Sequence, residues 1–185
     1  MFIRQLICSV LLTFVATLAL AQVPLVDSPL PALSIADRGE LFMENDDFSF
    51  RPWSTEQNPG KVHIVQYFGA TKGDSKLFKP FTDLLQDSLG LGNYHVTTIV
   101  NLDAALWGTS GFVISELKSS KRKYPLSTIV LDEDGSGLNT WQLGEQGAGL
   151  AILDQQGVVR YFTKKPMTEA EMSASLDLVK SKIDS

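Results

Sequence analysis

The feature that most constrains the fold is a nearly continuous apolar stretch at residues 62–68, which begins shortly after Gly60. A run of apolar residues at successive positions is typical of a strand that is covered on both faces of its sheet. Apolar residues at helical spacing follow over about residues 76–89, and Pro80 is expected to begin or kink that helix. A buried strand followed by an amphipathic helix predicts an α/β fold.

The same pattern recurs along the chain. Further runs of strand length lie at residues 96–100, 127–131, 150–153 and 158–162. A helix is predicted at residues 110–121, and Thr168 with Glu171 forms a capping box that begins a final helix. The order β-α-β-α-β, hairpin, α predicts a mixed sheet with flanking helices, of the thioredoxin-like (peroxiredoxin/thioredoxin) type. The first crossovers should be parallel and the last hairpin antiparallel.

The region before the first buried strand is less regular. Residues 33–35 and 41–43 are predicted to be short strands on either side of a turn at residues 37–39. Residues 48–59 mix aromatic, polar and proline residues and are predicted to form an ordered loop. Residues 138–143 either pair back onto the sheet or run irregularly.

Residues 1–21 have the three parts of a secretory signal peptide. Arg4 supplies the positive start, an apolar stretch follows, and Ala19-Leu20-Ala21 forms the cleavage motif. Cleavage between Ala21 and Gln22 would leave a single domain at residues 22–185. We therefore expect export to the periplasm, with no membrane span in the mature chain.

Cysteine and charge usage exclude several kinds of function. The only cysteine is Cys8, which lies in the predicted signal peptide, so the mature chain should have no disulfide and no thiolate metal site. The net charge is −5, and loss of Arg4 would make it more negative. We therefore expect no nucleic-acid partner.

The loop after the first buried strand is where thioredoxin-like enzymes place a nucleophilic cysteine, at a helix N-terminus that stabilises the thiolate. Here that loop, residues 69–75, contains hydroxyl groups of Thr71 and Ser75 but no sulfur. The stretch at residues 147–149 also lacks the proline or arginine common before the penultimate strand. Neither thiol-disulfide exchange nor peroxidase activity is expected, because hydroxyl groups lack the redox chemistry of sulfur.

Polar residues follow the ends of two central strands, where ligands of open α/β sheets tend to bind. The candidate ligand or partner surface comprises Thr71, Lys72, Asp74, Asn101, Asp103 and Trp141. Trp107 could add to an aromatic wall. In the alternative interpretation, Asn101 and Asp103 bind loop backbone and Trp141 fills the core; the sequence leaves both open.

No catalytic, metal-binding or cofactor-binding residue is predicted. His63 and His95 lie in or beside strands and are interpreted as structural, with a ligand or acid–base role as the alternative. Residues 132–135 contain acidic side chains but lack the later ligands of a calcium loop, so they are predicted to form a turn.

Several segments together resemble one family of small exported proteins. They are residues 37–41, 60–62, 97–101, 124–125 and 141–143, with the hairpin at 153–158. In this combination, over nearly the whole mature chain, the sequence is similar to the YtfJ family. The resemblance implies a periplasmic, thioredoxin-like protein of a Gram-negative bacterium, with no established activity and no known catalytic residues. The family pattern has two acidic residues where this chain has Asp103 and Ala104, which disfavours a paired-carboxylate role.

Three functional hypotheses remain. The leading one is a non-catalytic binding or interaction module that recognises an unknown periplasmic ligand or protein. The alternative is a thiol-independent enzyme that uses Asp103, Asn101, Lys72 or Asp74 at the carboxyl edge of the sheet. The third is a structural partner in envelope assembly.

Overall fold

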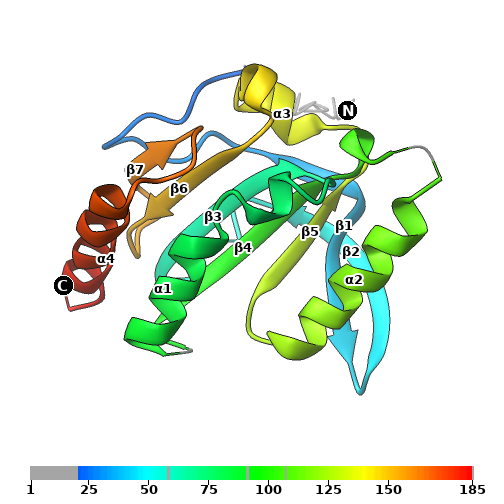
Figure 1. The fold of residues 1–185 in the computed structure, drawn as a ribbon, viewed down its shortest axis with the longest axis horizontal. Coiled ribbons are helices and arrows are strands. Elements are labelled where there is room, and N and C mark those ends of the chain that lie inside the picture. The colour runs from blue at the N-terminus through cyan, green and yellow to red at the C-terminus, as the bar shows by residue number, and fades with distance from the viewer. Residues whose placement is uncertain (1–20, 58, 91, 107, 185) are drawn as a thin grey trace, which may run out of the picture.

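The computed structural model describes residues 21–57, 59–90, 92–106 and 108–184. Strands and helices alternate through most of the chain (Figure 1). The strands are β1 (Ser34–Glu44), β2 (Asp47–Ser54), β3 (Val62–Gly69), β4 (Tyr94–Asn101), β5 (Thr128–Asp132), β6 (Gly149–Leu153) and β7 (Val159–Thr163). The α-helices are α1 (Lys79–Leu89), α2 (Ser110–Lys123), α3 (Ser136–Thr140) and α4 (Glu169–Ile183).

All seven strands form one mixed sheet in the order β2-β1-β5-β4-β3-β6-β7. The three central strands β3, β4 and β5 run parallel, whereas β6 and β7 pair antiparallel as a hairpin. The predicted mixed sheet, with parallel central strands and an antiparallel last hairpin, is therefore confirmed. Every residue of β3 is buried, in accordance with its nearly continuous apolar sequence.

Helices α1, α2 and α4 lie on one side of the sheet (Figure 1). Apolar side chains of these helices, such as Phe81, Leu85 and Val179, pack with Ile64 and Leu131 from the strands to form one hydrophobic core. Side chains alternate between the two faces of a strand, so the neighbouring strand residues face the other side of the sheet.

A second hydrophobic core covers the opposite face. Val65, Tyr67 and Ile99 of the central strands pack there with Trp53 of β2 and with Trp141. The segment before β1, residues 21–33, contributes Leu30 and Leu33 to this core, beside Leu138 of α3, and its Pro29 forms a bridge with Val158 just before β7. We refer to this segment as the lead-in.

Two predictions for the first part of the chain are wrong. Instead of two short strands and a turn at residues 37–39, β1 is one long strand with a register shift between Ile35 and Glu40. Gly39 there has φ 67°, and a Cβ on it would lie 2.3 Å from the carbonyl oxygen of Arg51, so a glycine is required. Residues 48–59 are not simply a loop, because β2 pairs along β1 as an edge strand.

The helix termini differ from prediction in detail. Helix α1 begins at Lys79 rather than near residue 76, with Pro80 as its second residue, a position that needs no backbone N–H donor. Residues 136–140 form the short helix α3, which overlaps the start of residues 138–143, for which the sequence allowed either pairing or an irregular path. The capping box of Thr168 and Glu171 at the start of α4 is confirmed.

Within the described residues, no helix combines the length and apolar character required to cross a membrane.

Candidate functional site

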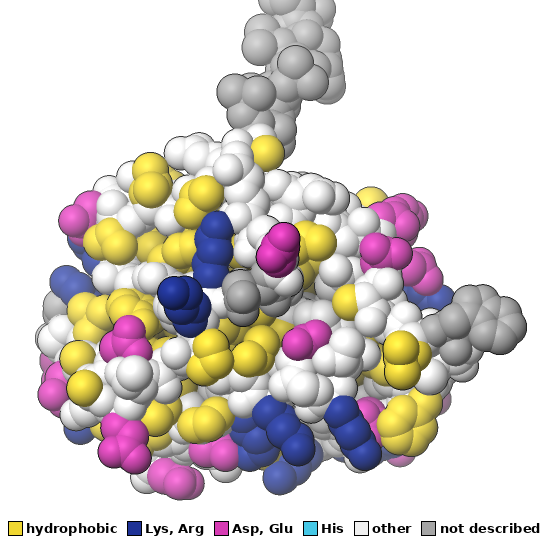
Figure 2. All heavy atoms as spheres, turned by 45° about the horizontal axis from the view of Figure 1, so that its top comes forward, with side chains coloured by type: hydrophobic (Ala, Val, Ile, Leu, Met, Phe, Trp, Pro, Cys, Tyr) yellow, Lys and Arg dark blue, Asp and Glu magenta, His cyan; other side chains and the backbone are white. Residues whose placement is uncertain are grey.

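The carboxyl edge of the three central strands is the predicted ligand surface. Gly69 of β3 pairs with Asn101 of β4, and Asn101 pairs with Asp132 of β5. The ends of the three strands therefore lie side by side, and the polar residues that follow them meet at one edge of the sheet. Figure 2, turned so that the upper side of Figure 1 comes forward, shows charged side chains of both signs among apolar ones.

Asp132 is the central polar residue of this edge, with 1% of its surface exposed. Its Oδ1 accepts a hydrogen bond from the backbone N–H of Ser136 at 2.9 Å. Its Oδ2 accepts from the N–H of Gly137 and from the Tyr67 hydroxyl, both at 2.8 Å. The carboxylate thus joins the first residues of α3 to Tyr67 of β3, and its oxygens are engaged by the protein itself.

Tyr67 supplies the side-chain donor to this carboxylate. Burial, with the neighbouring Asp132 charge as the next cause, raises the pKa of the Tyr67 phenol. The ring packs edge-on against Trp141, with the ring centroids 6.1 Å apart. The phenol therefore stays protonated and donates to Asp132 at any ordinary pH.

Asn101, which the sequence placed in the candidate surface, binds loop backbone instead. Its Oδ1 accepts from the N–H of Asp103 at 3.0 Å, and only 3% of Asn101 is exposed. Its amide also lies against Gly135, where a Cβ would be 3.3 Å from Nδ2. Of the two interpretations, the structure shows the backbone-binding one for Asn101, while the Asp103 side chain is exposed.

The loop after β3 brings the remaining predicted residues to the same edge. Thr71 Oγ1 accepts from the N–H of Asp74 at 3.1 Å, and Lys72 is exposed. A Cβ on Gly69 would lie 2.7 Å from Asp74 Oδ2 and 2.9 Å from Ala104 Cβ. The loop and the turn after β4 are therefore neighbours, which places Thr71, Asp74 and Asp103 on one side of the molecule.

Trp141 does not belong to the exposed part of this surface. It is 3% exposed, and its Nε1 donates to the carbonyl oxygen of Pro31 in the lead-in at 3.0 Å. The structure therefore places Trp141 in the second core, as the alternative interpretation had it. Trp107 lies outside the described residues.

The sequence did not predict that the two histidines are adjacent. His63 and His95 are paired residues of β3 and β4, with ring centroids 5.1 Å apart. Each Nε2 contacts a threonine hydroxyl on the next strand, Thr97 at 2.8 Å and Thr128 at 2.9 Å. The sequence pattern that could have predicted this contact is their shared position, because each histidine is the second residue of one of two successive parallel strands.

Both imidazoles are neutral under ordinary conditions. Burial, with His95 as a second cause, lowers the pKa of His63 to about 3. Burial, followed by the charges of Lys121 and Lys61, also lowers the pKa of His95. No cluster of three or more potential metal ligands is present in the described part of the chain.

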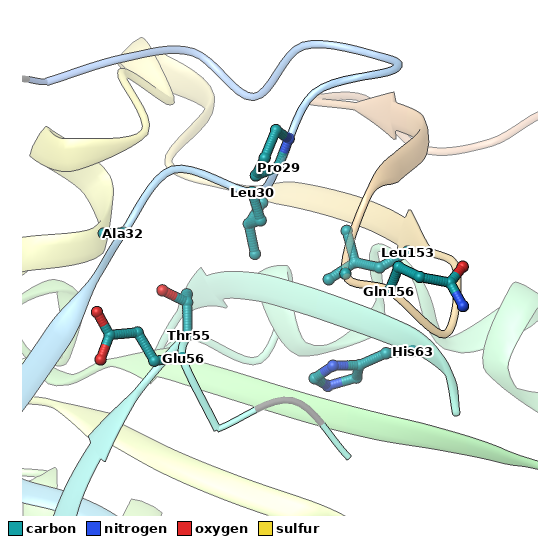
Figure 3. Close-up of a pocket in the computed structure, with 9 residues that line it drawn as sticks. Pro29, Leu30, Ala32, Thr55, Glu56, His63, Leu153 and Gln156 are labelled. Carbon is teal, nitrogen blue, oxygen red and sulfur yellow. The ribbon is translucent and has the colours of Figure 1, made fainter. Parts of the chain in front are cut away.

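A cavity of about 370 Å³ lies beside His63, at the opposite end of β3 from the carboxyl edge. It is open to solvent and is lined by Pro29, Leu30 and Ala32 of the lead-in, by Thr55 and Glu56 after β2, and by Leu153, Gln156 and Gly157 at the end of β6 and in the following turn (Figure 3). A second, more open hollow is lined by residues 138–144. None of the residues predicted for the carboxyl-edge surface lines either of these two cavities.

Solved structures share this arrangement of the chain. A putative protein disulfide isomerase from Bacteroides thetaiotaomicron superposes with a TM-score of 0.56 at 12% identity, covering 91% of this chain and 96% of that one. The thioredoxin domain of a thiol-disulfide oxidoreductase from Bacteroides vulgatus gives 0.55 at 12% identity, covering 83% and 96%. At such identities the likeness shows the fold alone, and it confirms the predicted α/β thioredoxin-like class.

Sequence relatives give the family. The uncharacterized protein YtfJ of Escherichia coli (strain K12) is 35% identical over 151 residues, which are 81% of this chain and 82% of that protein. Residues 25–182 match the family described as a bacterial protein of unknown function, YtfJ_HI0045. The chain therefore belongs to the YtfJ family of bacterial proteins of unknown function.

Proposed function

We propose that this protein is an exported, periplasmic binding or interaction module that uses a thioredoxin-like fold for recognition, without thiol chemistry. The observation that carries the proposal is the use of polar groups at the carboxyl edge. The side chains of Asp132 and Asn101 are buried and bonded to the protein's own backbone. They stabilise the edge and are not available to activate a nucleophile.

The absence of cysteine from residues 22–185 supports the same conclusion. A thiol-disulfide exchange step needs a thiolate that attacks a disulfide sulfur, and a peroxidase step needs a thiolate that is oxidised to a sulfenic acid. The hydroxyl of Thr71, which accepts from Asp74, can undergo neither reaction. The fold is therefore present without the atom on which its redox reactions depend.

Recognition would use the side chains that remain accessible at the carboxyl edge. Lys72 and Asp103 are exposed, and Thr71 and Asp74 are partly exposed beside them. Opposite charges on adjoining loops favour a polar partner surface over an anionic polymer. No observation in the structure specifically favours the thiol-independent enzyme.

Periplasmic location is part of the proposal and rests on the signal-peptide pattern of residues 1–21. Cell fractionation with intact-mass measurement tests it. The protein should appear in the periplasmic fraction with Gln22 as its first residue. A cytoplasmic protein that retains residues 1–21 would contradict it.

The absence of thiol chemistry is tested with residues 22–185 in insulin-reduction and peroxide-consumption assays, with a thioredoxin and a peroxiredoxin as positive controls. We expect no turnover above buffer in either assay. Activity that co-purifies with the protein through successive columns at constant specific activity would refute the proposal.

The recognition surface is tested separately with charge-reversal variants. Asp103→Lys changes the proposed surface, whereas Asp87→Lys makes the same change at an exposed position near the C-terminus of α1. We expect Asp103→Lys to lose a periplasmic ligand or partner that the wild-type protein and Asp87→Lys retain. Equal retention by all three proteins would contradict the assignment of this surface.

A further inference from the structure

The cavity beside His63 has a buried polar group directed into it. His63 is 6% exposed, and its Nε2 is held by Thr97 Oγ1 at 2.8 Å. The other ring nitrogen, Nδ1, forms no hydrogen bond with any residue that the structure describes. Within those residues, no fully buried side-chain nitrogen or oxygen lacks a partner, so Nδ1 is not fully buried, and the His63 side chain lines the cavity. A ring nitrogen that has no protein partner and opens to such a space is free to form a hydrogen bond with a bound molecule.

The surroundings of this nitrogen are mainly apolar. Figure 3 shows Pro29 and Leu30 on one side of the space, His63 on the opposite side and Leu153 between them. The polar groups lie toward the rim, where Glu56 and Gln156 are exposed. The volume of about 370 Å³ lies within the range of small-molecule sites.

Charge further restricts what could bind. Among the described residues that line the cavity, Glu56 is the only one with a charged side chain, and none is a lysine or arginine. The low pKa of His63 keeps the imidazole neutral, so it supplies no positive charge either. An anion would therefore lose its hydration shell without gaining a cationic partner.

We propose that this cavity is a binding site for a small uncharged molecule with an apolar body and one hydroxyl or amide group, which pairs with Nδ1 of His63. A hydroxyl both donates and accepts, so it satisfies either tautomer of the ring. The apolar body contacts the side chains of Pro29, Leu30 and Leu153. The cavity lies at the opposite end of the strands from the carboxyl edge, so this site is independent of the recognition surface proposed above.

Three probes of similar size test the ligand chemistry on residues 22–185: benzyl alcohol, toluene and benzoate. Binding is followed by titration in ¹H–¹⁵N correlation spectra, with the ring nitrogens of His63 observed separately. We expect saturable millimolar binding of benzyl alcohol, with shifts at Nδ1 and at the amides of Leu153 and Gln156. Toluene and benzoate should bind at least about tenfold more weakly, because they leave Nδ1 unpaired or require burial of a charge.

Two variants test the site itself. His63→Phe keeps an aromatic ring but removes Nδ1, and Ala32→Trp places a large side chain at the cavity from an exposed lead-in position. Ala36→Trp, an identical change at an exposed position of β1, is the matched control. We expect each of the first two to weaken benzyl alcohol binding at least about tenfold, and Ala36→Trp to leave it unchanged.

Each of the following results would overturn the proposal: no saturable binding of benzyl alcohol, equal binding of the three probes, or unchanged binding by Ala32→Trp. The Ala32→Trp arm remains decisive if His63→Phe fails to fold, because position 32 lies at the surface. A failure here would leave the insulin and peroxide assays unaffected, so the two proposals are tested separately.

Discussion

Replacing Asp132 by asparagine should destabilise the protein although it changes only one side-chain atom. The carboxylate accepts one backbone N–H at each oxygen, from Ser136 and Gly137, and the Tyr67 hydroxyl as well. In asparagine, one of the two positions becomes an NH₂ donor. Whichever way the amide is turned, this donor faces one of the two backbone N–H donors, so one buried hydrogen bond is lost.

The expected loss follows from these contacts. An unsatisfied buried donor costs about 1–3 kcal/mol, and the remaining bonds lose the charge that strengthened them. Relief of the buried charge offsets part of this loss, so we expect Asp132→Asn to lower the free energy of unfolding by about 3 kcal/mol. Tyr67→Phe removes only one of the three bonds and should cost about 1–2 kcal/mol.

Urea unfolding of residues 22–185, followed by far-UV circular dichroism, measures these differences. Asp103→Asn is the matched control, because Asp103 lies at the same edge but is exposed, and its effect should stay within about 0.5 kcal/mol. The Tyr67→Phe/Asp132→Asn double variant should be more stable than the sum of the single effects predicts, because the two residues share a bond. If Asp132→Asn were no worse than Asp103→Asn, the structural role of Asp132 would be refuted.

Three further predictions concern other parts of the fold. His63 in the unfolded chain takes up a proton near pH 6.5, whereas folded His63 does so only near pH 3. The contribution of His63 to the free energy of unfolding is therefore full above pH 6.5 and decreases as the pH falls from 6.5 to about 3. Between pH 7.5 and 5 the wild type should lose about 2 kcal/mol more than His63→Gln in urea unfolding, and parallel losses would contradict the buried neutral ring. Gly137→Ala should lower the free energy of unfolding by about 3 kcal/mol, because the new Cβ would lie 2.4 Å from the Tyr67 ring. A thermal unfolding midpoint equal to that of the wild type would disprove this contact. Thr168→Ala should lower the free energy of unfolding by about 1 kcal/mol, because it removes the helix cap, and should speed hydrogen exchange in the first turn of α4. Unchanged exchange in that turn would contradict this prediction.

The regular half of the fold was predictable because local and tertiary preferences agree there. The nearly continuous apolar sequence of β3 indicated a strand buried on both faces, and the Thr168 capping box indicated the start of α4. The edge strand β2 was missed because it carries alternating polar and aromatic residues with an internal Pro52, a pattern shared with loops. The sequence did not predict that β1 is continuous, because a glycine between two short apolar runs is expected in a turn as well as in an irregularity within a strand. In the structure, Gly39 has a positive φ and lies at the register shift of β1.

The candidate site was predictable only in outline. The rule that ligands bind at the carboxyl ends of strands located the edge, but it did not reveal which side chains point inward. Asn101 and Trp141 are buried because their partners, the N–H of Asp103 and the carbonyl of Pro31, are fixed by loop conformations that have no pattern in the sequence. The cavity beside His63 was missed because it depends on packing of the lead-in against strands that are distant in the sequence.

Native mass spectrometry of the protein isolated from the periplasm of its own bacterium is the sharpest test of recognition without thiol or redox chemistry. We expect a chain that begins at Gln22, lacks Cys8 and carries a non-covalently bound molecule or partner protein. A functional secreted chain that retains Cys8, or one that carries a bound redox cofactor, would contradict recognition without thiol or redox chemistry.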